Sequence, residues 1–340
     1  MITNFPGDVP GAIAAGTASV VLSGHGGDRL PGVPPSPSTI KVSRGAAPAR
    51  VQSMPDPDAT MMRLASLAEA QMSKVRQSLS PLCKICGSAS APFDIVDFAK
   101  TCNADIYALG LSGIAVVFFR CDRCDFLFTT LFDDFSPEEM GSAIYNAAYS
   151  EVDPDFISRR PQTNAIFIES MLRPAKRETI GLDYGGGQGL TAQLMRNDGW
   201  RFDNLDPFGN TEMDQCNSGR YTVCTAFEVF EHLPDPVTSL SEIVALASPD
   251  RFMMIIGTHL SDSSVNNATR LSWWYAAPRN GHISLFSKKA MAWLAETCSL
   301  DYYNPRPTLH LLTRRHSRVE LQKAMFQYVA RRVLRKLGDR

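Results

Sequence analysis

Short apolar runs alternate with amphipathic stretches through the C-terminal half of the chain. Three runs have the length of a strand, and each is followed, directly or after a loop, by apolar residues at helical spacing: TIGLDY, YTVCTAF and RFMMIIG. The run RFMMIIG is almost wholly apolar, as expected of a strand that is buried on both faces. This alternation predicts an α/β fold around a mostly parallel sheet.

The first 60 residues lack such a pattern. They are roughly half Gly, Pro, Ala and Ser, a composition that buries too little apolar surface to offset the loss of chain entropy. We therefore expect a disordered tail over residues 1–60. An alternative is that the native protein starts at a later methionine, Met54 or Met61.

Three further segments separate this tail from the alternating region. Residues 61–80 have apolar positions at helical spacing and predict one amphipathic helix. Residues 81–132 contain the strand-like runs FDIV and IAVVFF, which predict a small β module. Ser136 and Glu139 then form an S-x-x-E capping box, which opens a helical linker over residues 133–175.

Charge and hydropathy narrow the classes of partner. The net charge of −1 over 340 residues offers no overall attraction to nucleic acid or to an anionic membrane. No apolar run reaches the roughly 18 residues of a membrane span, and no basic residue precedes the mildly apolar segment GAIAAGTASVVLSG. We therefore expect a cytoplasmic protein. Residues 314–340 predict a basic amphipathic helix, for which packing on its own domain is favoured over peripheral membrane contact.

Four of the eight cysteines stand in two C-x-x-C pairs that flank the β module. The first pair is Cys83 and Cys86, and the second is Cys121 and Cys124. Two such knuckles supply the four thiolates of a tetrahedral zinc site, which predicts a zinc-ribbon-like module with a structural Zn²⁺. Four buried or redox-active cysteines without metal are the alternative.

The segment LDYGGGQGL follows a predicted strand and opens a predicted helix, which is the place of a cofactor-binding turn. A dinucleotide fingerprint G-x-G-x-x-G would require Gly or Ala where Leu190 stands. A phosphate-binding loop would require a lysine after the glycines, and none is present. NAD, ATP and GTP are therefore disfavoured.

The remaining pattern, D-x-G-x-G-x-G from Asp183 to Gly189, resembles the class I S-adenosylmethionine-dependent methyltransferases. The resemblance implies that this turn holds the methionine end of the cofactor and that Asp206, about 20 residues later, meets the ribose hydroxyls. The segment TAFEVFEHLPDP resembles the strand end that lines the cofactor in this family. The implied cofactor-binding residues are Asp183, Gly185, Gly186, Gly187, Gly189, Asp206, Phe227 and Glu228.

The resemblance also implies a Rossmann-like sheet of seven strands in a methyltransferase domain over residues 176–313. LDYYN and LHLLT would form the antiparallel pair that closes this sheet. The segment between Asp206 and Tyr221 is short, so the usual third strand is expected to be shortened or absent.

A C-x-x-C module ahead of such a core is similar to bacterial sugar C-methyltransferase-like proteins. This similarity implies a small-molecule acceptor, with a sugar or glycan precursor as one candidate class. His282, in the loop after the fifth strand, and His232 are the candidate general bases, although either could instead bond only to loop backbone. Two other functions stay open: a nucleic-acid methyltransferase that uses its zinc module for binding, and a non-catalytic scaffold.

Overall fold

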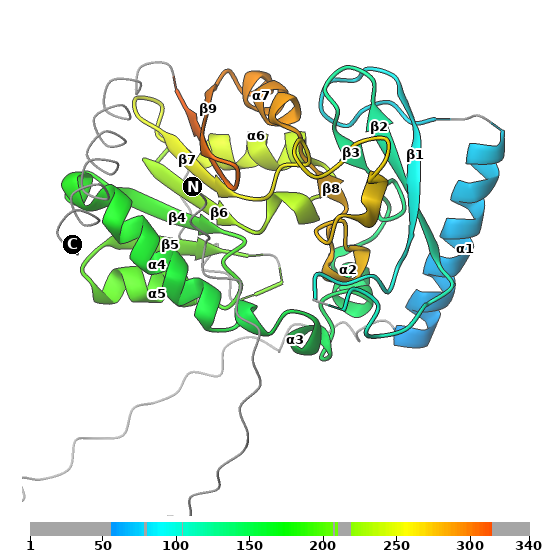
Figure 1. The fold of residues 1–340 in the computed structure, drawn as a ribbon. Helices are drawn as coiled ribbons and strands as arrows, with labels where there is room; N and C mark the ends of the chain where they lie inside the picture. The colour runs from blue at the N-terminus through cyan, green and yellow to red at the C-terminus, as the bar shows by residue number, and fades with distance from the viewer. Residues whose placement is uncertain (1–55, 78–79, 104, 207, 210–218, 315–340) are drawn as a thin grey trace, which may run out of the picture. The chain divides into compact units, whose positions relative to one another are not determined.

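The computed structural model describes residues 56–77, 80–103, 105–206, 208–209 and 219–314 (Figure 1). The expected tail over residues 1–60 and the expected C-terminal helix over residues 314–340 lie outside these ranges, apart from residues 56–60 and 314. Among the described helices, none combines the length and the apolarity needed to cross a bilayer.

A mixed sheet of six strands forms the larger layer of the fold. Its spatial order is β5-β4-β6-β7-β10-β9, with parallel pairing from β5 to β7 and antiparallel pairing at β10 and β9. The strands are β4 Ile180–Tyr184, β5 Arg201–Leu205, β6 Val223–Phe227, β7 Met253–Gly257, β9 Asp301–Arg306 and β10 Leu309–Thr313. The antiparallel pair that the sequence predicts at the end of the chain is therefore present.

The expected number of strands needs a correction, because the described residues supply six strands to this sheet and not seven. The chain passes from β5 to β6 through a connection of which residues 207 and 210–218 lie outside the described ranges. The position where a third strand would pair with β5 is an open sheet edge among the described strands. The shortness of this connection is the physical reason for the difference, as the sequence indicates.

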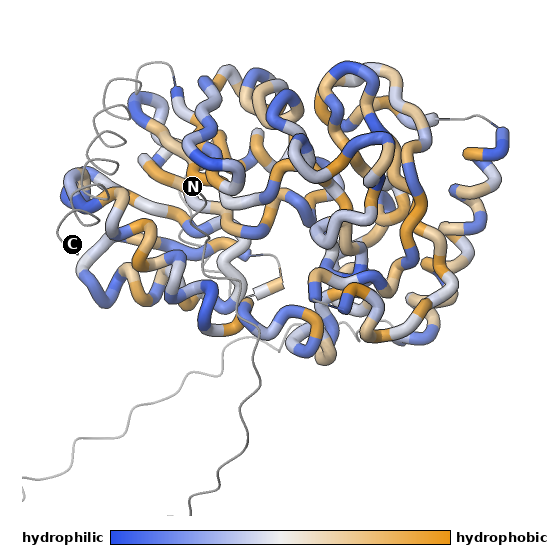
Figure 2. Tube along the Cα trace, in the orientation of Figure 1, coloured by the Kyte–Doolittle hydropathy of each residue, from blue (hydrophilic) through white to orange (hydrophobic). Residues whose placement is uncertain are grey.

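Helices cover both faces of the six-stranded sheet. One face packs against α4 (Arg159–Leu172) and α5 (Leu190–Asn197), and the other packs against α6 (Pro236–Leu246) and α7 (Lys288–Thr297). Strand residues alternate between these two cores, as the period of two requires. Figure 2 shows the result as apolar stretches through the sheet and recurrent polar residues along α4.

A separate antiparallel sheet has the order β1-β2-β3-β8, and its first three strands precede the larger sheet in sequence. Its strands are β1 Ser90–Asp97, β2 Ala115–Cys121, β3 Leu127–Phe128 and β8 Ser284–Leu285. The last strand comes from the distant loop after β7, since Leu127 pairs with Leu285 and Phe128 with Ser284. The β module of residues 81–132 thus borrows a strand that the local sequence pattern did not reveal.

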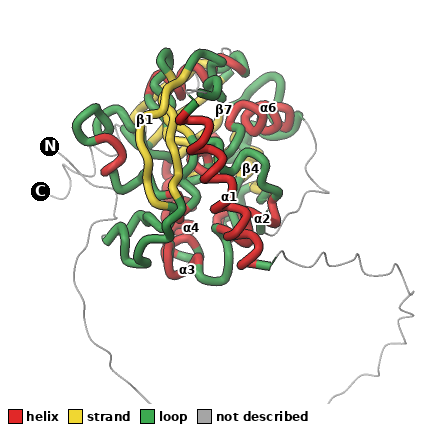
Figure 3. Tube along the Cα trace, turned by 90° about the vertical axis from the view of Figure 1, so that its right-hand side faces the viewer, coloured by secondary structure: helices red, strands yellow, loops and turns green. Residues whose placement is uncertain are grey.

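Helix α1 runs from Pro57 to Arg76 and packs against β2 (Figure 3). It begins before residue 61, the expected start, because Asp56 caps it and Pro57 occupies its first position. The side chain of Gln71 binds the sheet from this helix: its Oε1 accepts from the N–H of Val117 at 3.2 Å. Residues 57–60 are therefore helical, and not part of a disordered tail.

The expected helical linker contains several short helices. The predicted capping box is present at α2 (Pro137–Ala143), where Ser136 Oγ accepts from the N–H of Glu139. The rest of the segment consists of α3 (Tyr149–Val152), α4 and the 3-10 turns Pro154–Phe156 and Arg173–Ala175. Further 3-10 turns within the described ranges are Phe230–His232, Arg270–Ser272 and Pro278–Asn280.

Candidate active site

The glycine turn follows β4 directly and leads into α5. Three of its glycines adopt the left-handed region, with φ of 72° at Gly185, 58° at Gly187 and 80° at Gly189. Side chains with a Cβ rarely adopt this region, which explains the run of glycines. Gly189 is the N-cap of α5, so the free N–H groups of the first helical turn begin where the glycines end.

Asp206 ties the end of β5 to this turn. Its carboxylate accepts from the N–H of Gly187 at 2.7 Å and from the N–H of Phe208 at 2.7 Å. On the same strand, Asn204 Nδ2 donates to the carbonyl of Gly187 at 3.2 Å. The predicted ribose ligand therefore lies beside the glycine turn.

Two glycines of the turn differ in what surrounds them. A Cβ added to Gly186 would lie 2.2 Å from Asn204 Oδ1 and 2.5 Å from Asp183 Oδ2, so packing alone requires glycine there. A Cβ added to Gly187 would meet no atom within 4 Å. Gly187 therefore borders open space, and this main-chain cradle fits a cofactor that approaches the backbone closely.

Asp183 lies buried at the end of β4, beneath the turn. Its Oδ1 accepts a hydrogen bond of 2.6 Å from Thr225 Oγ1 on the neighbouring strand β6. Burial, and to a smaller extent the negative charge of Asp206, raise the pKa of this carboxyl group to about 6. These contacts fix the position of the strand end.

Glu228 is the first residue after β6 and has a positive φ of 53°. This conformation costs a residue with a Cβ roughly 1–3 kcal/mol, and such outliers cluster at functional sites. The N–H of Glu228 donates to the carbonyl of Gly257 at 2.8 Å, which holds the bend against β7. The bend points the chain from the sheet edge into the turn that carries Glu231 and His232.

The hydroxyl of Tyr275 brings two carboxylates together. It lies 3.0 Å from Glu228 Oε2, within hydrogen-bond reach of Glu231 Oε1, and 3.2 Å from Thr258 Oγ1. A phenol has one proton to donate, so it can satisfy only one of the two carboxylates at a time. Burial, and then the negative charge of Glu228, raise the pKa of Glu231 well above its ordinary value.

The two predicted catalytic histidines lie against each other in this cluster. The ring centroids of His232 and His282 are 4.9 Å apart. His282 Nδ1 donates to the carbonyl of Tyr275 at 2.7 Å, which leaves Nε2 with its lone pair. Burial lowers the pKa of His232 to about 4 and that of His282 well below its usual value. Both rings are therefore neutral at pH 7.

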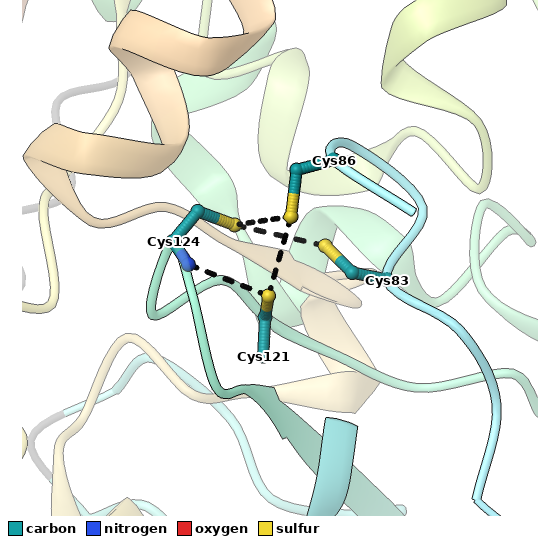
Figure 4. A group of neighbouring side chains, drawn as sticks. All are labelled: Cys83, Cys86, Cys121 and Cys124. Atoms are coloured by element: carbon teal, nitrogen blue, oxygen red, sulfur yellow. Dashed lines mark hydrogen bonds between the residues drawn. The ribbon is translucent and has the colours of Figure 1, made fainter. Parts of the chain in front are cut away.

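The four cysteines of the two C-x-x-C pairs converge on one point (Figure 4). The Sγ atoms of Cys83 and Cys124 are 3.6 Å apart, and those of Cys86 and Cys121 are 3.4 Å apart. Tetrahedral zinc with Zn–S bonds of about 2.3 Å sets its sulfurs about 3.8 Å apart. All four are free thiols, so the cluster has nearly the geometry of a closed metal site.

Comparison with known proteins gives the enzyme class. Residues 156–302 match the family model described as a methyltransferase domain. The protein is an S-adenosylmethionine-dependent methyltransferase. The match includes the glycine turn, Asp206, Glu228 and both histidines of the cluster. No curated protein matches the chain.

Several solved methyltransferases resemble this one at low sequence identity. The plantazolicin methyltransferase BpumL, solved in complex with SAH, is 14% identical with a TM-score of 0.37, over 52% of this chain and 94% of that one. The magnesium protoporphyrin IX methyltransferase (ChlM) from Synechocystis PCC 6803 is 13% identical with a TM-score of 0.33, over 45% and 82%. The pyocyanin biosynthetic protein PhzM is 15% identical with a TM-score of 0.34, over 53% and 64%.

Not every residue predicted for the methyltransferase site faces the glycine turn. Phe227 packs edge to face against Phe167 of α4, with 5.9 Å between ring centroids, and covers Gly257. The ring of Tyr145, in the linker, lies 4.9 Å from the ring of Phe208 and 6.1 Å from that of His232. It therefore connects the segment after β5 with the histidine cluster.

Sequence reasoning missed how the small sheet supports the loop after β7 that carries Tyr275 and His282. Lys100, which is buried beyond β1, donates from Nζ to the carbonyls of Leu271 at 2.6 Å and Trp273 at 2.8 Å. Two residues later, the N–H of Cys102 donates to Asn280 Oδ1 at 2.9 Å. No sequence signal separates this lysine from an ordinary surface lysine, because its partners are carbonyls about 170 positions away.

Proposed function

We propose that this methyltransferase acts on a small-molecule acceptor that reacts beside the acceptor cluster, defined as Glu228, Glu231, His232, Tyr275 and His282. The observation that carries the proposal is the strained Glu228 at the carboxyl end of β6. That strand pairs directly with β4, which ends in the glycine turn. Cofactor cradle and cluster thus occupy neighbouring strand ends, where an α/β sheet binds its ligands.

The glycine turn and Asp206 would hold the cofactor. S-adenosylmethionine, when bound, supplies a methyl group on a positively charged sulfur. The open side of Gly187 leaves room for the cofactor against the main chain, and Asp206 would accept hydrogen bonds from its ribose hydroxyls. Asp183 would position the turn from below, through Thr225.

The acceptor cluster would prepare the nucleophile. Its two imidazoles and two carboxylates supply lone pairs that can take a proton from the acceptor or hold a cation next to it. Either role favours the deprotonated, nucleophilic form of an acceptor hydroxyl, amine or acidic carbon, because a base removes the proton and a cation lowers the pKa of the acceptor. Holding that atom near the methyl carbon would supply the larger share of the rate, up to roughly 7–11 kcal/mol.

A sugar or glycan precursor is the acceptor class that we propose. The support comes from the two C-x-x-C pairs ahead of the catalytic core, as in the bacterial sugar C-methyltransferase-like proteins that the sequence resembles. Trp273 and Trp274 precede Tyr275, and Trp274 is 43% exposed. An exposed indole next to the cluster offers a flat face on which a sugar ring can pack.

We also propose that the four cysteines hold a structural Zn²⁺. With four protein ligands, the site would be closed, so the metal would stabilise the fold and leave no position for water. Its thiolates would persist in the reducing cytoplasm, which is the compartment we propose. The Cys83 thiol has a pKa lowered to about 5, because Cys124 donates a hydrogen bond to it, consistent with a thiolate in this group.

Calorimetry with S-adenosylmethionine tests the cofactor site. We expect Asp206→Ala to weaken binding by about 2–3 kcal/mol, since a charged acceptor of hydrogen bonds is lost. Asp203→Ala is the matched control, because Asp203 lies on the same strand but bonds to Tyr221 instead of the turn. Equal affinity in wild type and Asp206→Ala would remove Asp206 from the site. No binding of the cofactor or of SAH to the folded wild type would overturn the proposal.

The acceptor is tested by incubating the enzyme with S-adenosylmethionine and a panel of nucleotide-linked sugars, with released SAH as the readout. We expect turnover with at least one sugar and none with RNA or DNA oligonucleotides of matched concentration. Turnover with an oligonucleotide alone would contradict the proposed acceptor class.

A further inference from the structure

The acceptor cluster contains polar atoms that the protein itself does not satisfy. Glu231 is fully buried, and its Oε2 has no hydrogen-bond partner. His232 Nδ1 is equally enclosed and has none. Leaving such groups unpaired costs roughly 1–3 kcal/mol each, so buried polar atoms without partners often indicate a missing ligand.

The arrangement of side chains around these atoms resembles a coordination sphere. One ligand atom each from Glu231, His232 and His282 lies within 4.8 Å of the other two. A tetrahedral Zn²⁺ with bonds of about 2.0–2.1 Å sets its ligands about 3.3 Å apart. Side-chain rotations that move each ligand atom by about an ångström would bring these atoms to the separation that the ion requires.

A second layer of contacts orients the possible ligands. His282 Nδ1 donates to the carbonyl of Tyr275 at 2.7 Å, the contact by which metal-binding histidines commonly fix their ring and expose the other nitrogen. The hydroxyl of Tyr275 bonds to Glu231 Oε1 and leaves Oε2 free. Glu231 and His282 thus each have one atom held by the protein, while Glu231 Oε2 and His232 Nδ1 have no partner in the protein.

Charge favours a cation here. Glu228 and Glu231 share the single proton of Tyr275, and within the described part of the chain neither carboxylate forms an ion pair with a lysine or arginine. Neutral imidazoles add no positive charge. A divalent ion would compensate the charge of the buried Glu231, whose burial without a counter-charge is costly, and that of the half-buried Glu228 beside it.

We propose that Glu231, His232 and His282 bind one divalent transition-metal ion, such as Zn²⁺ or Co²⁺, separate from the four-cysteine site. Two imidazoles and one carboxylate are a common donor set for such ions. Three protein ligands leave a fourth position for an oxygen of the acceptor. That last consequence rests on the proposed function, whereas metal binding itself does not. As ligands, the two histidines would act on the acceptor through the ion.

Co²⁺ titration of the full-length enzyme tests the proposal. The four-cysteine site is first filled with Zn²⁺, weakly held metal is removed with a mild chelator, and Co²⁺ is added while absorption and heat are recorded. We expect one further equivalent per chain, with the visible bands of Co²⁺ but without the charge-transfer bands of thiolate ligands. Total metal per chain, measured by mass spectrometry of the elements, should rise from one to two.

Variants locate the second ion. His282→Gln and Glu231→Gln should lose the second equivalent of metal and keep the first. Tyr275→Phe should weaken binding of the second equivalent roughly 10–100-fold, because it releases Glu231. His259→Gln is the matched control, since its ring lies 4.7 Å from that of Tyr275 but outside the trio. Circular dichroism and cofactor affinity identify any variant that fails to fold, in which case Tyr275→Phe carries the test.

Two results would overturn the proposal: a wild-type enzyme that takes up no Co²⁺ beyond the filled cysteine site, or a second equivalent that His282→Gln and Glu231→Gln both retain. Methyl transfer by enzyme with one metal per chain would overturn the role of the ion in holding the acceptor, and would leave the proposed function standing. A second ion bound at the trio without turnover of any acceptor would support the metal site and contradict the proposed function.

Discussion

Ser287 Oγ donates a hydrogen bond of 2.6 Å to the carbonyl of Cys124, the last cysteine of the second C-x-x-C pair. The same oxygen accepts from the N–H of Ala290 at 3.0 Å and thereby caps α7. One hydroxyl thus connects the four-cysteine site with a helix of the catalytic core. Phe126 and Phe286, with ring centroids 5.0 Å apart, extend this contact.

We predict that Ser287→Ala destabilises the protein and loosens the metal of the cysteine site. The loss of the cap and of the donor to a buried carbonyl should lower the free energy of unfolding by about 1–3 kcal/mol, measured by urea denaturation. Ser136→Ala removes the N-cap of α2, which has no contact with the cysteines, and should cost about 1 kcal/mol. Zinc release to a chromogenic chelator should accelerate only in Ser287→Ala, and equal rates in both variants would contradict the connection.

Gly187→Ala should impair cofactor binding more than folding. The added Cβ meets open space in the free protein, so the stability cost is that of a left-handed alanine, about 1 kcal/mol. Where a cofactor lies against the turn, the same Cβ should weaken its binding at least tenfold in calorimetry. Gly110→Ala is the control, because Gly110 also has a positive φ and open surroundings but lies in the small sheet module. Unchanged cofactor affinity in Gly187→Ala would place the ligand elsewhere.

Asp183 should make a pH-dependent contribution to stability. Its pKa of about 6 in the fold exceeds the ordinary value of 3.8, so the protonated form is favoured in the folded protein. The contribution is therefore complete below about pH 4 and is lost as the pH rises through about 6, by up to about 3 kcal/mol. As the pH rises from 4 to 7, the free energy of unfolding of the wild type, measured by denaturation, should fall relative to that of Asp183→Asn. A constant difference would show that burial does not raise this pKa.

Lys100→Met should destabilise the loop that carries Tyr275. The substitution keeps an apolar stem of similar length and removes the donor to the carbonyls of Leu271 and Trp273, at a cost of about 1–3 kcal/mol. Tryptophan fluorescence should report the changed surroundings of Trp273. Lys74→Met, on the exposed face of α1, should change stability by less than about 0.5 kcal/mol. A Lys100 variant as stable as the Lys74 variant would show that these bonds contribute nothing.

The parts of the fold that follow from local pattern were predictable. The strands around RFMMIIG, the capping box at Ser136 and the N-cap at Ser287 all follow from residues close together in sequence. The glycine turn was recognisable because its positive φ angles require glycines. These features needed no knowledge of distant contacts.

What sequence reasoning missed depends on long-range packing. Strand β8 contributes only Ser284 and Leu285 to its sheet, too short a segment for any periodicity to mark it. Glu231 gained its significance from Tyr275, which reaches it from a loop 44 positions away. The start of α1 before residue 61 depends on the cap at Asp56, which stands in a Pro-rich context that does not indicate a helix.

Strand β8 also constrains the order in which the chain can acquire its structure. The N-terminal sheet receives its fourth strand only after the ribosome has translated Leu285, long after β1 to β3 have emerged. Until then β3 presents an unpaired edge, the kind of surface at which nascent chains associate wrongly. Closure of this sheet is therefore a late, high-contact-order event, and it must wait for the catalytic core that delivers the missing strand.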